Sequence, residues 1–225
     1  AEYVYKAQAE GRGVYSFCMC PGGFVVPAST GPEETVVNGM SPANRGSRWA
    51  NSGLVVELHP EDIPATGIQV EDPTSPLALM QWCEAFEHKS YLAANRSLRA
   101  PAQRMTDFVA RRHSSTLPSS SYTMGLTSSD LHEWMPDFIT RRLSAGFRAF
   151  DRTTRGFLTG EAQLIGVESR TSSPVRIPRD RMTYAHPVVA GLYPAGEGAG
   201  FAGGIVSAAI DGENAAQQIA LALGR

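Results

Sequence analysis

Apolar and polar residues alternate along the first quarter of the chain, between clusters of turn residues. The segments "GVYSFCMC", "GGFVVPAS", "ETVVNGM" and "SGLVVELH" show this alternation, and Pro21-Gly22-Gly23, Gly31-Pro32 and the polar stretch "SPANRGSRWAN" separate them. A period of two between glycine, proline and asparagine residues is typical of half-buried strands joined by turns. The pattern therefore predicts an antiparallel β region over residues 13–58.

A helical period replaces this alternation in the middle of the chain. Ser75-Pro76 supplies an N-cap and a first-turn proline, and apolar residues at helical spacing follow, which predicts a helix over residues 76–95. Two further helices are expected, one over residues 103–112 and one from Pro136 onward. The second has an apolar stripe formed by Ile139, Leu143, Gly146, Phe147 and Phe150. The polar segment between them, "HSSTLPSSSYTMGLTSSD", has the composition of a lid or a flexible loop.

The last third of the chain changes character again. Residues 161–177 have the pattern of a strand that runs into a loop, and "AGLYPAG" (190–196) has that of a short buried strand. A terminal helix is expected over residues 205–223, with mostly small residues on one face. These residues are Ile205, Ala208, Ala209, Gly212, Ala216, Ile219 and Leu223. Small residues at helical spacing let a helix approach a sheet closely, so this stripe is expected to be buried.

Composition narrows the class of ligand rather than naming one. The chain has 225 residues, 42% of them hydrophobic, which is enough to build a core. The net charge of −2 and the absence of a Lys/Arg run argue against a nucleic-acid partner or an acidic membrane surface, and favour a small-molecule substrate. Three cysteines make no disulfide framework, and no signal peptide or long apolar run is found, so a cytoplasmic location is expected.

The segment "GLYPAGEGAGFAGG" carries the spacing G-x-G-x-x-G at Gly198, Gly200 and Gly203, between a strand-like and a helix-like run. Such a connection directs the free N–H groups and the partial positive charge of a helix N-terminus at an anionic or electron-rich ligand. The glycines are equally consistent with a tight strand-to-helix connection. The motif alone leaves both interpretations open.

Two other groups of residues are candidates for chemistry. Cys18 and Cys20 are candidate catalytic residues, as a nucleophile or an electron relay, although on an alternating strand both would point to one face and could equally be core residues. A polar loop offers a forked cation and hydroxyls for a carboxylate or carbonyl, or forms an ordinary turn before Pro174. Its residues are Arg170, Thr171, Ser172, Ser173 and Arg176. The five histidines lack ligand spacing, so no metal site is expected.

Several separated blocks carry a resemblance to known flavoproteins. The run "VAGLYPAGEGAGFAGGIVSAAIDG" resembles the closing segment of glutathione-reductase-like flavoproteins. Together with "SFCMCPGGFVVPAS", "VVNGMS", "ANSGLVV", "APAQR" and "SRTSSPVRI", in this order, it is similar to the uncharacterised bacterial FAD-dependent dehydrogenases often labelled NAD-utilizing or NAD(FAD)-dependent. The resemblance spans nearly the whole chain.

This resemblance implies a FAD site at the terminal turn. Glu197, where most members have Asp, would bind the ribityl hydroxyls of FAD, and the following helix would point at the N1/O2 edge of the flavin. The implied cofactor-binding residues are Gly196, Glu197, Gly198, Ala199, Gly200, Phe201, Gly203 and Gly204.

The resemblance also implies a domain organisation. The whole protein would be α/β, and this chain, α+β by itself, would be its C-terminal half. Residues 1–180 would form a substrate-side domain, with an antiparallel β unit over 13–58 and 161–177 and a helical insertion over 76–152. Residues 181–225 would supply the closing strand and helix of a FAD/NAD(P)-binding domain. The pyrophosphate-binding turn that opens such a domain is not found here, so the chain alone is not expected to retain FAD.

Two functions follow as alternatives. The full-length protein is expected to be a FAD-dependent oxidoreductase acting on a small molecule, with NAD(P) as a further cofactor. The alternative is a non-catalytic binding or assembly domain with an incomplete cofactor site. The expected partner is the N-terminal FAD-binding half, and a homo-oligomer formed through the terminal helix is left open.

Overall fold

The computed structural model of the protein describes residues 5–224, and the alternating N-terminal segments form its longest strands. Strands β1 (Tyr5–Ala9), β2 (Arg12–Pro21) and β5 (Ala50–Val56) form an antiparallel sheet in the order β1-β2-β5. Glu10 and Gly11 connect β1 to β2, and both have positive φ, as a two-residue hairpin turn requires. Strands β3 (Phe24–Pro27) and β4 (Val37–Met40) make a second antiparallel pair.

The third sheet combines segments that are far apart in the sequence. Strand β6 (Ala100–Arg104) lies between β7 (Leu126–Ser128), which is parallel to it, and β8 (Gln163–Ile165), which is antiparallel. Strand β8 therefore does not join the β1-β2-β5 sheet. The chain after β8 still reaches the N-terminal strands, because the Val37 amide donates to the Val167 carbonyl at 2.9 Å.

The long helices confirm the helical periods in the sequence. These are α2 (Ala78–Ala93), α5 (Asp137–Thr153) and α6 (Ile205–Ala222). The shorter helices are η1 (Pro60–Asp62), α1 (Ile63–Thr66), α3 (Met105–Ala110) and α4 (Leu131–Trp134). The predicted helix over residues 103–112 is wrong at its start, because the chain up to Arg104 is strand β6 and only α3 is helical.

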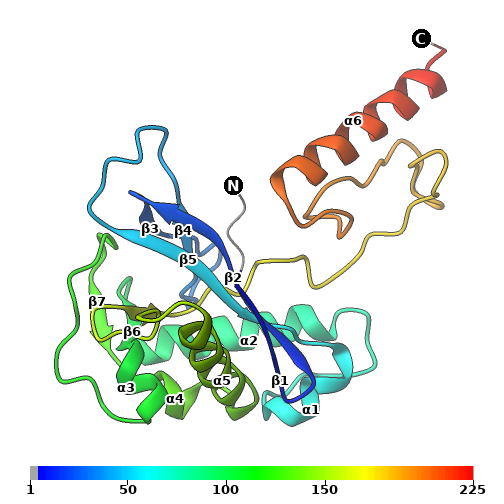
Figure 1. The fold of residues 1–225 in the computed structure, drawn as a ribbon. Coiled ribbons are helices and arrows are strands. Elements are labelled where there is room, and N and C mark those ends of the chain that lie inside the picture. The colour runs from blue at the N-terminus through cyan, green and yellow to red at the C-terminus, as the bar shows by residue number, and fades with distance from the viewer. Residues whose placement is uncertain (1–4, 225) are drawn as a thin grey trace. The chain divides into compact units, whose positions relative to one another are not determined.

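The main core lies between α5 and the β1-β2-β5 sheet (Figure 1). Phe147 and Phe150 are fully buried there against Val14 of β2. Gly146 brings the helix close to the strand, since a Cβ at this position would lie 2.5 Å from Cγ1 of Val14. The apolar stripe predicted for this helix is the one that the structure buries, and its packing accounts for the α+β class of the chain.

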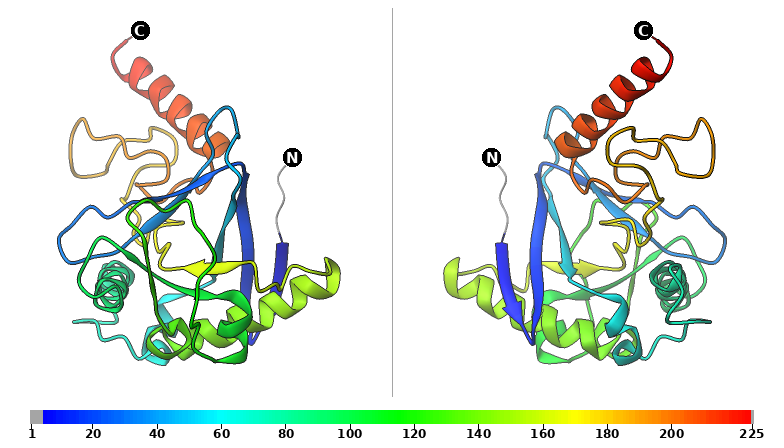
Figure 2. Two further views of the ribbon diagram at one scale, coloured as in Figure 1. Left: turned by 90° about the vertical axis from the view of Figure 1, so that its left-hand side faces the viewer. Right: turned by 90° about the vertical axis from the view of Figure 1, so that its right-hand side faces the viewer.

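The chain divides into two compact units. The first comprises the described residues up to Pro73 together with Gln81–Ser169, and it contains all three sheets. The second comprises residues 74–80 and 170–224. Within its described residues it has no strand, and α6 is joined to irregular loops (Figure 2).

The short buried strand predicted at residues 190–196 is therefore wrong. These residues form a turn and an irregular segment, and Ala190, Gly191 and Leu192 are exposed. A strand needs a neighbour to pair with its backbone N–H and C=O groups. No strand of the described part of the second unit offers that pairing, so the closing strand expected for a FAD/NAD(P)-binding domain is not formed in this chain.

Candidate functional site

The turn that precedes α6 is held in shape by its own backbone. The Phe201 amide donates to the Gly196 carbonyl at 3.0 Å, and the Gly200 amide donates to the Glu197 carbonyl at 2.8 Å. Gly196 and Gly200 have φ values of 73° and 81°, in the left-handed region that glycine adopts without strain. A Cβ on Gly200 would also lie 2.6 Å from the Val175 carbonyl oxygen, so the fold itself requires glycine there.

At other positions of the turn, the fold itself does not require glycine. A Cβ on Gly198 would meet nothing within 4 Å, and one on Gly203 would meet only the Ser172 hydroxyl at 3.9 Å. The N-cap residue Gly204 gives the first turn of α6 no side-chain cap. An open, glycine-lined backbone at the start of a helix fits a cofactor that lies against the chain and accepts hydrogen bonds from it. The turn therefore fits the FAD that the sequence resemblance implies.

Glu197 lies at the outer side of this turn. Its side chain is exposed and has no hydrogen-bonding partner among the described residues. Ala199, by contrast, is buried, and Phe201 is half-buried beneath two guanidinium groups. The eight predicted cofactor residues thus differ in exposure: Ala199 is buried, whereas Glu197 and Gly198 are exposed.

The predicted polar loop reaches the same turn within the second unit. The Arg176 Nε donates to the Gly200 carbonyl at 2.9 Å, and the Ile177 amide donates to the Ala199 carbonyl at 3.1 Å. The Ser173 hydroxyl lies 3.2 Å from the Gly198 carbonyl oxygen. Two of the five loop residues, Ser173 and Arg176, thus contact the turn, and both hold its carbonyl groups.

The other three loop residues do not share that role. Arg170 is exposed, and the Ser172 side chain is close only to the open position at Gly203. The Thr171 hydroxyl is buried and has no hydrogen-bonding partner among the described residues. Arg170 and Ser172 are thus exposed loop residues, whereas the Thr171 hydroxyl is enclosed.

An ion pair that the sequence analysis missed links the turn to α6. The Asp211 carboxylate accepts hydrogen bonds from Arg179 at 2.9 and 2.6 Å and from the Gly196 amide at 2.8 Å. The hydrogen bonds from Arg179 hold the pKa of Asp211 below its usual value. Arg179 and Asp211 are 32 residues apart, and no local pattern relates them.

Cys18 and Cys20 do not point to one face of β2. The pairing of β2 with β5 shifts between Phe17 and Cys20, and Cys18 within this bulge has a φ of 49°. Cys18 is consequently exposed, whereas Cys20 is buried with its thiol 3.2 Å from the Cys18 carbonyl oxygen. The extra residue breaks the alternation on which the same-face expectation rested.

Glu168 is a further titratable group that the sequence analysis did not single out. Its Oε2 lies 3.0 Å from the position that a Cβ on Gly53 would take, next to the ring of Phe17. Burial raises the pKa of this carboxyl, and no hydrogen bond or ion pair to it is found among the described residues. A carboxyl in this setting can hold a proton at a higher pH than an exposed one.

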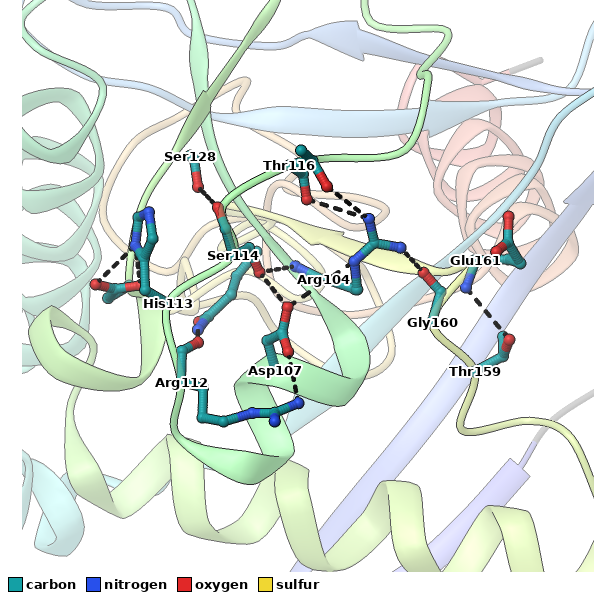
Figure 3. Close-up of polar contacts among 12 residues, drawn as sticks. Arg104, Asp107, Arg112, His113, Ser114, Thr116, Ser128, Thr159, Gly160 and Glu161 are labelled. Carbon is teal, nitrogen blue, oxygen red and sulfur yellow. Dashed lines mark hydrogen bonds and ion pairs between the residues drawn. The ribbon is translucent and has the colours of Figure 1, made fainter.

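A polar network surrounds Ser114 in the first unit (Figure 3). The Ser114 hydroxyl donates to Asp107 at 2.9 Å and accepts a hydrogen bond from the Arg104 amide, while Ser128 donates to its carbonyl. His113 is hydrogen-bonded to Asp130 at 2.9 Å and not to Ser114, so these residues do not form a nucleophilic triad. The network instead ties the segment 113–130 to β6 and α3, which corrects the expectation of a lid or flexible loop.

Within residues 5–224, no cluster of three or more His, Cys, Asp or Glu side chains is arranged to hold a metal ion. The helices in the same range are all too short or too polar to cross a membrane.

The comparison with known proteins shows the family to which the chain belongs. The sequence model of the family described as "FAD-dependent protein, C-terminal domain-like" matches residues 1–171, and the chain belongs to this family. The chain is also 42% identical, over 218 residues, to an uncharacterized protein of Clostridium beijerinckii (strain ATCC 51743 / NCIMB 8052). That alignment covers 96% of this chain and 39% of the relative, so the chain spans about two fifths of the length of the protein it matches.

Proposed function

We propose that this chain is the C-terminal part of a longer FAD-dependent oxidoreductase of the glutathione-reductase-like class. The observation that carries the proposal is the family match, whose description is that of a C-terminal domain of FAD-dependent proteins. The length of the relative supports it, because the matched region is only 39% of that protein. The finer assignment, a dehydrogenase acting on a small molecule, rests on the resemblance of the sequence blocks.

The terminal turn supplies the contacts to the cofactor in this proposal. The exposed carboxylate of Glu197 would accept hydrogen bonds from the ribityl hydroxyls, and the uncapped first turn of α6 would direct its amides at the N1/O2 edge. Gly198 would let the chain approach the cofactor without a side chain between them. FAD, when bound, supplies the electron- and hydride-transfer chemistry.

We propose separate roles for the polar loop of the second unit and for Glu168 of the first unit. Arg170 would bind a carboxylate or carbonyl group, with Thr171 and Ser172 as hydroxyl partners. Glu168 would hold or accept a proton during the reaction, since burial already favours its protonated form. Cys18, which is exposed, remains the thiol proposed for redox chemistry, and Cys20 is assigned to the interior.

The exposed apolar face of α6 supports the proposal that another part of the longer protein packs against it. Ile205 is 91% exposed and Val206 is 71% exposed, and Ala215 is the buried residue of this helix. The stripe predicted to be buried is thus largely open in this chain, at Ile205, Ala209 and Leu223. Apolar surface of this kind is normally covered. We propose that the N-terminal FAD-binding half of the longer protein covers it.

The experiment compares the longer protein with this chain. Both are purified without added flavin, and the flavin absorbance is measured per mole of protein before and after NADH or NADPH is added. The proposal predicts FAD in the longer protein, none in this chain, and bleaching of the flavin band by a reductant. A longer protein that neither carries nor takes up FAD would refute it and favour the binding or assembly alternative.

A further inference from the structure

The carboxylate of Asp211 joins the beginning of the cofactor turn to the helix that follows it. It lies on α6, seven residues after Gly204, and accepts the Gly196 amide at 2.8 Å. The hydrogen bond spans 15 residues of chain and reaches the residue directly before Glu197. Asp211 therefore fixes the point at which the turn starts.

Arg179 extends this linkage to three more segments. It donates two hydrogen bonds to Asp211 and one, at 2.7 Å, to the Pro194 carbonyl before the turn. Its guanidinium also lies 3.6 Å from the ring centre of Phe201, after the turn, and 4.1 Å from that of Tyr184. One side chain thus contacts both ends of the turn and the helix.

The pair is shielded from solvent, unlike most surface ion pairs. The side chains of Arg179 and Asp211 are 9% and 13% exposed. A two-pronged guanidinium–carboxylate contact in such a setting fixes geometry more firmly than an exposed pair does. Removing one partner would leave the other charge poorly solvated and would release the Gly196 amide.

Beyond the two backbone hydrogen bonds within the turn, its residues leave the backbone free to adopt other conformations, so contacts from outside the turn help to order it. Glycine at positions 196, 198, 200, 203 and 204 gives the backbone more conformational freedom than any other residue would. A binding site that must be ordered as the ligand arrives loses affinity by the cost of that ordering. A clamp that orders the turn beforehand raises the affinity without touching the ligand.

We propose that Asp211 and Arg179 are positioning residues for the FAD site, a clamp that sets the direction of the Gly196–Glu197 segment relative to the first turn of α6. The proposal rests on the proposed function, since it presumes that the turn binds FAD. The pairing with Arg179 also neutralises the charge of Asp211. That charge therefore does not offset the partial positive charge at the start of α6, and this partial charge would stabilise negative charge on the reduced flavin.

The first unit contains a matched control. The Asp62 carboxylate accepts two hydrogen bonds from Arg12, both 2.7 Å long, and one from the His59 amide at 2.9 Å. Asp62 and Asp211 therefore have the same set of donors, a guanidinium fork and one backbone amide. Asp62→Asn should affect folding in the way that Asp211→Asn does, but it touches no residue of the turn.

The experiment uses the longer protein, from which FAD is removed and to which FAD is added back. The FAD dissociation constant, the thermal midpoint of the apoprotein and the reduction potential of the bound flavin are measured for Asp211→Asn, Arg179→Lys and Asp62→Asn. We expect Asp211→Asn to weaken FAD binding about tenfold or more, the effect of losing one or two charged hydrogen bonds. Arg179→Lys, which keeps the charge but not the fork, should give a smaller loss, and Asp62→Asn should leave the dissociation constant within about twofold.

The outcomes separate the two proposals. A wild-type longer protein that takes up no FAD contradicts the proposed function itself. A wild type that binds FAD, with Asp211→Asn and Asp62→Asn lowering the thermal midpoint alike and neither changing FAD affinity or potential, overturns the clamp and leaves a purely structural pair. If Asp211→Asn does not fold, Arg179→Lys decides, because unchanged FAD affinity in that variant contradicts the clamp as well.

Discussion

The Arg176 guanidinium donates a hydrogen bond to the Gly200 carbonyl at 2.9 Å, and this contact joins two sequence blocks that each had an open interpretation. The block "SRTSSPVRI" read equally as a binding loop or an ordinary turn, and the glycine motif as a ligand site or a tight connection. Their contact shows that part of the loop builds the turn. The Thr171 hydroxyl takes no part in that construction and is buried without a hydrogen-bonding partner among the described residues.

The two kinds of glycine in the turn give the first prediction. Gly200→Ala should destabilise the second unit by about 1–3 kcal/mol, because its positive φ and the nearby Val175 carbonyl both exclude a side chain. Gly198→Ala should leave folding unchanged, since its Cβ would meet nothing, yet weaken FAD binding by the longer protein. Thermal unfolding and FAD titration of both variants test this. Equal effects of the two substitutions on stability would contradict the assignment.

The close approach of α5 to the sheet gives the second prediction. Gly146→Ala should lower the free energy of unfolding by about 1–3 kcal/mol, because the added methyl would lie 2.5 Å from Val14 Cγ1 and force the helix away from β2. Urea unfolding measures the change. Ala145→Ser, one residue earlier at an exposed position of the same helix, is the control and should change stability by less than about 0.5 kcal/mol. A stabilising Gly146→Ala would show that the interface is less tightly packed than described.

The pKa of Glu168 gives the third prediction, on pH dependence. Because burial raises the pKa of Glu168 in the folded state, folding binds a proton that the unfolded chain releases, and stability falls as pH rises from the unfolded value of 4.5 through the folded value. Glu168→Gln should therefore be more stable than wild type at neutral pH and similar to it in acid. Glu161→Gln, at an exposed position, is the control and should show no such trend. A stability difference for Glu168→Gln that does not vary with pH would contradict the prediction.

The bulge in β2 gives the fourth prediction. In the folded protein Cys18 should react with a thiol reagent much faster than Cys20, because the first side chain is exposed and the second is buried. Cys18→Ser should leave stability unchanged, and Cys20→Ser should lower it by about 1 kcal/mol as a buried apolar contact is lost. Mass spectrometry after brief labelling measures the reactivity. If neither substitution changes the rates of flavin reduction and reoxidation in the longer protein, both thiols have structural roles only.

The hydrophobic period predicted an element correctly where that element packs against a single neighbouring sheet. The stripe around Phe147 and Phe150 faces one sheet, and α5 forms where the period predicted it. Strand β6 shows the limit, since Gln103 and Arg104 pair with β8, some 60 residues later, whereas the local pattern placed both in a helix. The strand prediction for "AGLYPAG" fails for the opposite reason, because its strand-like pattern meets no partner strand within residues 5–224.

The site was predicted in part for related reasons. The glycine spacing marked the turn, and "SRTSSPVRI" marked the loop that Arg176 and Ser173 attach to it. The Arg179–Asp211 pair could not be found in this way, because a contact between residues 32 positions apart leaves no periodic trace. The difference in exposure between Cys18 and Cys20 could not be predicted either, because it depends on a register shift between β2 and β5.

The affinity of the longer protein for FAD, compared between wild type and Glu197→Ala, is the most direct test of whether the terminal turn binds FAD. We expect the wild-type apoprotein to bind one FAD per chain, and Glu197→Ala to weaken this binding by about 1–3 kcal/mol, the effect of losing one charged hydrogen-bonding group. Glu197→Gln should weaken FAD binding less than Glu197→Ala does, since glutamine keeps an acceptor oxygen. A wild-type protein that does not bind FAD, or a Glu197→Ala variant with unchanged affinity, would contradict it.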